Sequence, residues 1–254
     1  MKKILYIFAS FAIVAGAYYV TVIRDGALLH PEASETFASD TASLTEDSFN
    51  RFDKTWKRNA SDYENAINDL GDGGLRFILR QGDMPAGSDQ AKLRERAEIS
   101  GSAFATPLAG TYDFDFTVSV QAYDNAPSWS SLVQILTDDT DPDLAYRPLV
   151  KMQTRPSEGR ITLNTYLPAF QEVGSIPMLP VQTPHKVRIT VNFETGYMRW
   201  AVDGQTIVSG IVTGMDLAGQ NSARIYPKLG AYREGPVTQT AVTDFHAVSF
   251  VQRN

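Results

Sequence analysis

Hydrophobic and polar residues alternate with a period of two along most of the chain after Leu70. This alternation is typical of strands that bury one face, and glycine and proline residues fall mostly between the alternating segments. Because no long helical pattern interrupts the series, the predicted fold class is all-β, an antiparallel β-sandwich. The predicted strands are Leu75–Arg80, Leu93–Ile99, Tyr112–Val120, Leu132–Leu136, Leu149–Gln153, Ile161–Leu167, Lys186–Phe193, Tyr197–Val202, Thr206–Ser209, Lys228–Tyr232 and Val242–Val251.

The segment from Leu44 to Leu70 shows a weak helical pattern instead. Its large apolar residues stand singly among polar ones, and we expect one or two short helices or turns that pack on the rim of the sandwich. These apolar residues are Phe49, Phe52, Trp56, Tyr63 and Ile67.

The first residues predict a targeting segment. Lys2 and Lys3 precede an uncharged run that ends before Arg24, and Ala15-Gly16-Ala17 offers a small-x-small cleavage site. The pattern favours a signal peptide over residues 1–17, with an uncleaved membrane anchor over residues 4–23 as the alternative. In either case we expect the body of the protein outside the cytoplasm, secreted or periplasmic, or membrane-anchored and extracytoplasmic.

The rest of the chain divides into two parts. Residues 18–45 are predicted to be a linker, because most of this stretch is rich in Ala, Ser, Thr, Asp and Glu without a period. Residues 46–254 are predicted to form a single β-domain, and we expect a monomer.

Composition and charge narrow the function classes. The 254 residues include 23 Lys and Arg against 29 Asp and Glu, a net charge of −6. Nucleic acid is not an expected partner, because phosphate neutralisation supplies most of that affinity and the chain has no basic block. The absence of cysteine excludes disulfides, thiolate zinc sites and cysteine nucleophiles. With only three histidines as well, no metal and no other cofactor is expected.

Two predicted strands carry polar groups on one face. Arg94, Arg96 and Glu98 share a face, where Glu98 can orient Arg96 through a charge-assisted hydrogen bond. In the strand Leu132–Leu136, Gln134 lies on the face opposite the core residues. Taken alone, each pattern is most simply a solvated or hydrogen-bonded strand face.

Two further strands have similar polar faces. Lys228, Gly230 and Tyr232 share a face, and the glycine is expected to leave room for a ligand beside the backbone. Asn164 and Tyr166 share the polar face of Ile161–Leu167. Trp129, Trp200 and the alternating Tyr112, Phe114 and Phe116 are most economically core or rim aromatics.

Together and in this order, the polar elements resemble the jelly-roll polysaccharide lyases. The elements are Arg96-Ala97-Glu98, then Gln134-Ile135, then Tyr226–Arg233, which reads Tyr-Pro-Lys-Leu-Gly-Ala-Tyr-Arg. This group comprises the alginate lyases, the glucuronan lyases and the heparin lyase I-like enzymes. The resemblance covers roughly residues 70–254. It implies a concanavalin-like jelly roll, here preceded by the short helical segment.

The resemblance also implies an enzyme, a lyase that cleaves a uronic-acid-containing polysaccharide by β-elimination. Its site must neutralise the uronate carboxylate, while a base removes the C5 proton and an acid protonates the glycosidic oxygen. By match to the motifs, Tyr232 is expected to be the acid or acid/base, with Arg96 and Gln134 holding the carboxylate. The expected partner is an anionic polysaccharide, and the expected substrate-binding residues are Lys228, Arg94, Asn164, Tyr166 and Arg233.

One position departs from the family pattern. Many of these lyases follow Gln-Ile with a histidine that helps to abstract the proton, and here that position is Leu136. None of His30, His185 and His246 matches a catalytic histidine by motif. Two hypotheses stay open. Either Tyr232 works as base and acid with Asn164 or Tyr166 assisting, or the domain is a non-catalytic carbohydrate-binding or surface-adhesion protein.

Overall fold

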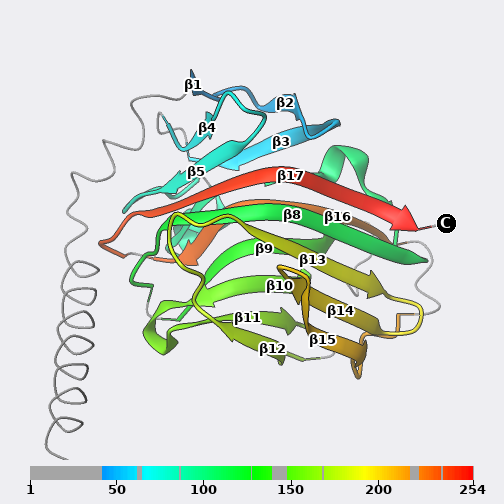
Figure 1. The fold of residues 1–254 in the computed structure, drawn as a ribbon. Helices are drawn as coiled ribbons and strands as arrows, with labels where there is room; N and C mark the ends of the chain where they lie inside the picture. Colours follow the sequence, from blue (N-terminus) through cyan, green and yellow to red (C-terminus); the bar gives the residue numbers. More distant parts are fainter. Residues whose placement is uncertain are drawn as a thin grey trace, which may run out of the picture. The chain divides into compact units, whose positions relative to one another are not determined.

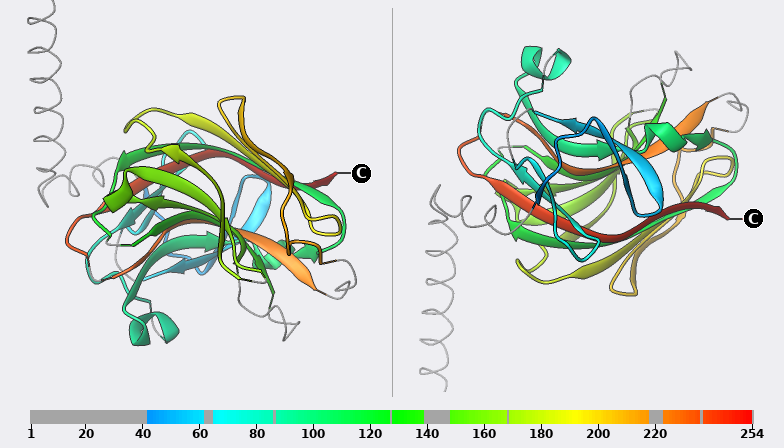
Figure 2. Two further views of the ribbon diagram at one scale, coloured as in Figure 1. Left: turned by 90° about the horizontal axis from the view of Figure 1, so that it is seen from below. Right: turned by 90° about the horizontal axis from the view of Figure 1, so that it is seen from above.

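Two antiparallel sheets pack face to face in the computed structural model, and views from below and above show them as two layers (Figure 1, Figure 2). The structure describes residues 42–61, 65–85, 87–126, 128–138, 148–167, 169–217, 223–235 and 237–253. The predicted signal peptide, the alternative anchor, His30 and most of the predicted linker lie outside these residues. No helix in the described ranges has both the length and the apolar character needed to cross a membrane.

The first sheet has eight strands, and the chain ends in it. Its order is β1 (Ala42–Ser43), β4 (Ile67–Asp69), β5 (Leu75–Leu79), β17 (Ala241–Arg253), β8 (Thr111–Ala122), β13 (His185–Asn192), β14 (Tyr197–Val202) and β15 (Gln205–Ile211).

The second sheet has nine strands, and β9 to β12 form a meander along it (Figure 1). Its order is β12 (Gln171–Pro177), β11 (Arg160–Thr165), β10 (Pro148–Arg155), β9 (Ser130–Thr137), β16 (Arg224–Glu234), β6 (Arg94–Ser100), β3 (Lys54–Ala60) and β2 (Ser48–Arg51), with β7 (Thr106–Pro107) paired to β16. Within the described residues, three single-turn helices connect strands: α3 (Ser88–Ala91), η1 (Ser102–Phe104) and η2 (Pro156–Glu158).

Alternate residues of the facing strands build the core. On β13, Val187, Ile189 and Val191 are buried, whereas Lys186 and Arg188 are exposed, as the period of two predicts. Each such buried side chain contributes about 1.5–3 kcal/mol by leaving water. The all-β sandwich predicted from the sequence is therefore confirmed.

The predicted short helices over residues 44–70 are wrong, because the described part of this segment forms strands β1 to β4. Phe49 and Trp56 face each other across the β2–β3 hairpin. The turn between them has φ of 53° at Phe52 and 57° at Asp53, the left-handed geometry of a type I′ turn. Neither residue is glycine or asparagine, so the sequence lacks the usual hairpin signal at this turn.

Candidate active site

A row of polar residues crosses the nine-stranded sheet. The register pairs Lys228 on β16 with Gln134 on β9, Gln134 with Lys151 on β10, and Lys151 with Asn164 on β11. The flanking residues Leu229, Val133, Ile135, Val150, Met152 and Leu163 belong to the core between the sheets. Because successive side chains of a strand point to opposite faces, the polar row lies on the outer face of this sheet.

A cleft of about 590 Å³ lies on this outer face. Most of the residues predicted for the site line it: Arg94, Arg96, Gln134, Tyr166, Lys228 and Tyr232. Leu136 also lines the cleft, so an apolar side chain stands where the family pattern has histidine. The strands β6, β9, β10 and β16 therefore bring together residues that are up to 138 positions apart in the chain.

Arg96 lies between two carboxylates in the cleft. Its Nε and Nη2 donate to Asp89 at 2.7 and 3.0 Å, and its Nη1 donates to Glu98 at 2.7 Å. The hydrogen bond from Arg96 to Glu98 that the sequence predicted is confirmed. Burial disfavours the charge of Arg96, but Glu98 and Asp89 outweigh this and raise its pKa, so Arg96 is a permanent cation.

Glu98 also fixes the carboxamide of Gln134. The Gln134 Nε2 donates to the second Glu98 oxygen at 2.7 Å, and Glu98 is fully buried. A guanidinium has five N–H donors, of which Arg96 uses three, and Gln134 keeps one N–H. Arg96 and Gln134 therefore retain donors for an incoming carboxylate and are held in place by one shared anion.

Tyr232 lies against the two arginines of β6. The Cζ of Arg96 is 3.8 Å from the centroid of its ring, and Arg94 Nη1 donates to its hydroxyl oxygen at 2.9 Å. Burial raises the pKa of the Tyr232 phenol, and the opposing effects of Arg96 and Arg94 are smaller. Tyr232 is therefore protonated at neutral pH. Because its oxygen accepts from Arg94, its own proton is available to a ligand.

Sequence reasoning missed Lys151, which also lines the cleft. It is only 3% exposed, and its Nζ is 3.1 Å from the centroid of the Trp129 ring. Burial lowers the pKa of Lys151 well below its usual value, Glu98 opposes this, and Arg94, Arg155 and Arg96 lower it further. Trp129 itself was interpreted as a core or rim aromatic, and the structure places it on the cleft wall.

Lys228 and Gly230 occupy the part of β16 before Tyr232. Burial lowers the pKa of Lys228, and Glu98 and Asp89 act against the effect of burial. The prediction that Gly230 makes room for a ligand is wrong. A Cβ there would overlap the carbonyl oxygen of Ala97 and the Cα of Glu98, and φ is 134°. Gly230 therefore allows β6 to approach β16 closely, next to a register shift between β9 and β16.

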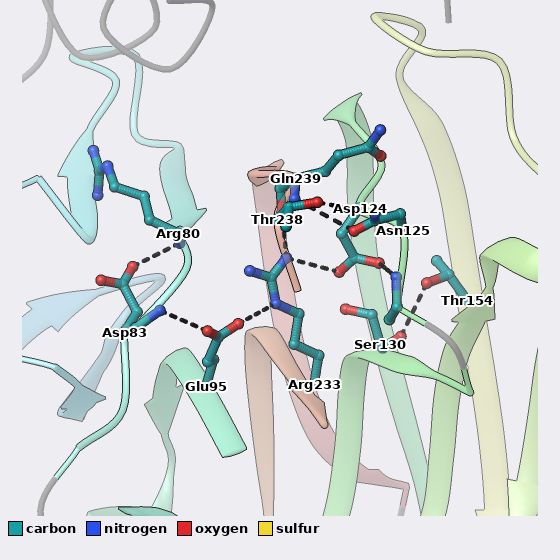
Figure 3. Close-up of polar contacts among 12 residues, drawn as sticks. Arg80, Asp83, Glu95, Asp124, Asn125, Ser130, Thr154, Arg233, Thr238 and Gln239 are labelled. Atoms are coloured by element: carbon teal, nitrogen blue, oxygen red, sulfur yellow. Dashed lines mark hydrogen bonds and ion pairs between the residues drawn. The ribbon is translucent and has the colours of Figure 1, made fainter. Parts of the chain in front are cut away.

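Two predicted substrate-binding residues do not line the cleft. Asn164 belongs to the polar row but is fully buried, and its Nδ2 donates to Thr162 Oγ1 at 2.8 Å. Arg233 is also fully buried, and Figure 3 shows its guanidinium among Glu95, Asp124 and Gln239. Its Nε donates to Glu95 at 2.6 Å and its Nη1 to the Gln239 carbonyl at 2.7 Å. The assignment of Arg233 to substrate binding is therefore wrong, because adjacent residues of a strand point to opposite faces.

The two histidines that the structure describes lie outside the cleft. His185 pairs with Asp203 at 2.7 Å, and His246 lies 3.6 Å from Asp72. Within the described ranges, no group of three or more His, Asp or Glu side chains is placed to hold a metal ion. The charged and titratable side chains that line the cleft are arginines, lysines, tyrosines and Asp89.

Several solved structures share this fold. Alginate lyase A1-II′, a member of polysaccharide lyase family 7, matches with a TM-score of 0.59 and 17% identity over 78% of this chain and 95% of its own. Alginate lyase PA1167 from Pseudomonas aeruginosa matches with a TM-score of 0.53 and 17% identity over 76% of this chain and 87% of its own. The marine PL7 alginate lyase AlyA1 from Zobellia galactanivorans matches with a TM-score of 0.54 and 15% identity over 74% of this chain and 80% of its own.

These matches confirm the jelly-roll fold that the sequence resemblance implied. No protein-family model and no curated protein sequence matches the chain.

Proposed function

We propose that this protein is a polysaccharide lyase that cleaves a uronic-acid-containing polymer by β-elimination. The observation that carries the proposal is the pairing of Tyr232 with Arg94 and Arg96 beside Gln134, in a cleft on the fold of the alginate lyases. Tyr232 can supply a proton, and the N–H groups of Arg94, Arg96 and Gln134 can bind a carboxylate. We also propose that the protein acts outside the cytoplasm, on the basis of its first residues.

The carboxylate of the uronate would bind to Arg94, Arg96 and Gln134. Elimination builds negative charge on this carboxylate as C5 loses its proton, and fixed N–H donors in a buried site stabilise that charge. Arg94 has the greater capacity, because no ion pair joins it to a carboxylate among the described residues, whereas Arg96 is bound by Asp89 and Glu98. Arg94 would therefore contribute more to binding the carboxylate, and Arg96, which Asp89 and Glu98 hold in place, would orient it.

Tyr232 would act as the acid. Its phenol is protonated at neutral pH and can donate to the glycosidic oxygen as the C4–O bond breaks. The phenolate that remains would be stabilised by the hydrogen bond from Arg94 and by the guanidinium of Arg96 against the ring. This assignment gives Tyr232 one of the two roles that the sequence left open.

The test is the formation of the unsaturated product. Purified protein is incubated with a panel of uronate polymers while the ultraviolet absorbance of the new C4=C5 double bond is recorded. Alginate comes first in the panel, because the A1-II′ alginate lyase with the same fold has been solved with its product GGG. We expect absorbance to rise with at least one polymer and the rise to fall by about 10²–10⁴ in Tyr232→Phe.

Two other outcomes would overturn the proposal. No rise with any polymer, together with measurable glycan binding, would identify a carbohydrate-binding or adhesion protein. A rise that is unchanged in Tyr232→Phe would show elimination without Tyr232. Lys186→Arg, on the exposed face of β13, serves as the control for purification and folding.

A further inference from the structure

The proposed elimination needs a base, and this inference rests on the proposed function. Among the described residues that line the cleft, the groups that can accept a proton are Asp89, Tyr166, Tyr232 and the lysines at positions 92, 151 and 228. Leu136 and Pro148, which line the cleft as well, cannot accept one. These six side chains are therefore the candidates for the base.

Four of these groups are poor bases, for reasons of geometry, electrostatics or exposure. Both oxygens of Asp89 accept hydrogen bonds from Arg96, so protonation of Asp89 would break a bidentate ion pair. Tyr232 and Tyr166 keep their hydroxyl protons at neutral pH, because burial raises the pKa of each side chain. Lys92 is exposed to solvent. The two buried lysines of the polar row remain.

Lys151 has the surroundings of a neutral amine. Its Nζ lies against the Trp129 ring, 5.9 Å from the centroid of Tyr232 and 6.0 Å from that of Tyr166. No hydrogen bond or ion pair joins this Nζ to another described residue. The rings beside Nζ attract its cation but cannot accept its proton, so no described acceptor holds a proton on this nitrogen.

We propose that the Lys151 amine is the base that removes the C5 proton. The nitrogen lone pair takes the proton, the C5–H electron pair becomes the C4=C5 double bond, and the C4–O bond breaks. The departing oxygen takes the proton of Tyr232. The step leaves an ammonium on Lys151 and a phenolate on Tyr232, and transfer of one proton from the first to the second restores the enzyme.

The charges around Lys151 favour its neutral form. From β6, Arg94 and Arg96 face it and lower its pKa, and Arg155 on its own strand acts in the same direction. Burial is the largest effect, and the charged group that opposes it is Glu98, which already binds Arg96 and Gln134. The rings of Tyr166, Tyr232 and Trp129 complete its surroundings.

Lys228 is the matched alternative on the same row. It lies on the other side of Gln134 and is also buried. Two carboxylates, Glu98 and Asp89, and one arginine, Arg96, act on the pKa of Lys228, whereas one carboxylate and three arginines act on that of Lys151. Lys228 therefore has the more balanced charge environment of the two, and its replacement provides a comparison within the site.

The test uses pH profiles and chemical rescue. Lys151→Arg keeps a cation that cannot lose its proton, and we expect kcat to fall by about 10²–10⁴. The remaining activity should lack the acidic limb of the wild-type profile, which reports the Lys151 amine. Lys151→Ala should recover activity with added methylamine or ethylamine, in proportion to the concentration of the unprotonated amine. Lys228→Arg should raise KM and keep the acidic limb.

The possible results separate the assignment of Lys151 as the base from the lyase proposal itself. Lys151→Arg with near wild-type kcat, or with an intact acidic limb, would overturn the assignment of the base and leave the lyase proposal standing. Rescue in proportion to the concentration of the protonated amine would show that Lys151 acts only as a cation. A wild-type protein that forms no unsaturated product would overturn both proposals. Circular dichroism of each variant, with Lys151→Met in place of any that unfolds, separates loss of the base from loss of the fold.

Discussion

Arg94 links the two titrating groups of the cleft. Its Nη1 donates to the hydroxyl of Tyr232, and its charge lowers the pKa of Tyr232 and of Lys151. The same guanidinium is the one cleft arginine without a carboxylate partner among the described residues. Binding of the substrate and the protonation of acid and base therefore depend on one side chain.

Replacing Arg94 should move the whole pH profile. In Arg94→Met both the Lys151 amine and the Tyr232 phenol lose a nearby cation, so the pKa of each rises. The acidic limb, which requires neutral Lys151, and the alkaline limb, which requires protonated Tyr232, should both shift to higher pH. KM should rise about tenfold or more through the lost carboxylate contact. Initial rates from pH 5 to 11 measure both effects, and a shift of either limb to lower pH would contradict the prediction.

Glu98 is the anion that positions Arg96 and Gln134. In Glu98→Gln the shape is kept and the charge is lost, so an NH2 group replaces one of the two acceptor oxygens and Lys151 loses the anion that raises its pKa. We expect kcat/KM to fall by about tenfold to a hundredfold, because the arrangement of the site is disturbed while its donors remain. The acidic limb should move to lower pH, since Glu98 raises the pKa of Lys151. An unchanged kcat/KM would show that Glu98 is only structural.

At the scale of elements, the outer face of β9 to β12 extends the cleft. Tyr166 follows β11 and lines the cleft, and Phe170, which is 50% exposed, packs against it with ring centroids 5.3 Å apart. Arg155 lies 5.7 Å from the Phe170 centroid. An exposed ring beside a cation suits a sugar unit that carries a carboxylate.

Removing this ring should affect long substrates selectively. We expect Phe170→Ala to raise KM about three- to tenfold for polymer, the equivalent of one lost ring contact. Short oligomers that fill only the cleft should keep the wild-type KM, and kcat should stay unchanged for both. Steady-state kinetics on a size series of oligosaccharides is the measurement. An equal increase of KM for all lengths would place Phe170 inside the catalytic cleft.

Comparison of predicted and observed strands shows which elements can be predicted from the sequence. Strand β14 was predicted with its observed limits, and β13 with its buried and exposed faces, because alternation is a local signal. The β2–β3 hairpin was missed, because its left-handed turn residues are Phe52 and Asp53. Strand β12 was also missed, since its residues are mostly half-buried or exposed at the edge of the sheet.

Only part of the candidate site could be predicted, because sequence patterns are local. Arg96, Gln134 and Tyr232 belong to local motifs, and the structure brings them together. Lys151 has no motif, and only the register of β10 against β9 places it beside Gln134. Arg233 was assigned through its motif, although its position next to Tyr232 in a strand already implied the opposite face. Pairing between strands depends on residues far apart in the chain, so the local patterns of a single sequence do not reveal it.

At the scale of the molecule, stability depends on a buried ion cluster beneath the site. Arg233 joins Glu95 on β6 to Asp124, which follows β8, and all three side chains are buried (Figure 3). In Arg233→Met two carboxylates would stay buried without their cation. We expect the free energy of unfolding to fall by about 3–5 kcal/mol. Activity per folded molecule should be retained, because Arg233 does not line the cleft.

Urea unfolding measures this effect, and the chain offers a matched control. Arg188 pairs with Asp115 on the exposed face of the other sheet, where its side chain is 49% accessible. Arg188→Met should cost less than about 1 kcal/mol, as exposed ion pairs do. Equal losses in the two variants would refute the role given to the buried cluster.

The charge of the whole molecule opposes the charge of the cleft. A net charge of −6 repels a polyanion at long range, whereas Arg94, Arg96 and Lys228 attract it at short range. Salt weakens both effects, because the Debye length falls from about 10 Å at 0.1 M to about 3 Å at 1 M. Charges in a cleft with low-dielectric walls interact more strongly than charges spread over a surface, so the local attraction should dominate. We expect KM for the polymer to rise about tenfold over this range of sodium chloride with little change in kcat. A fall of KM with added salt would show that the global repulsion controls the encounter.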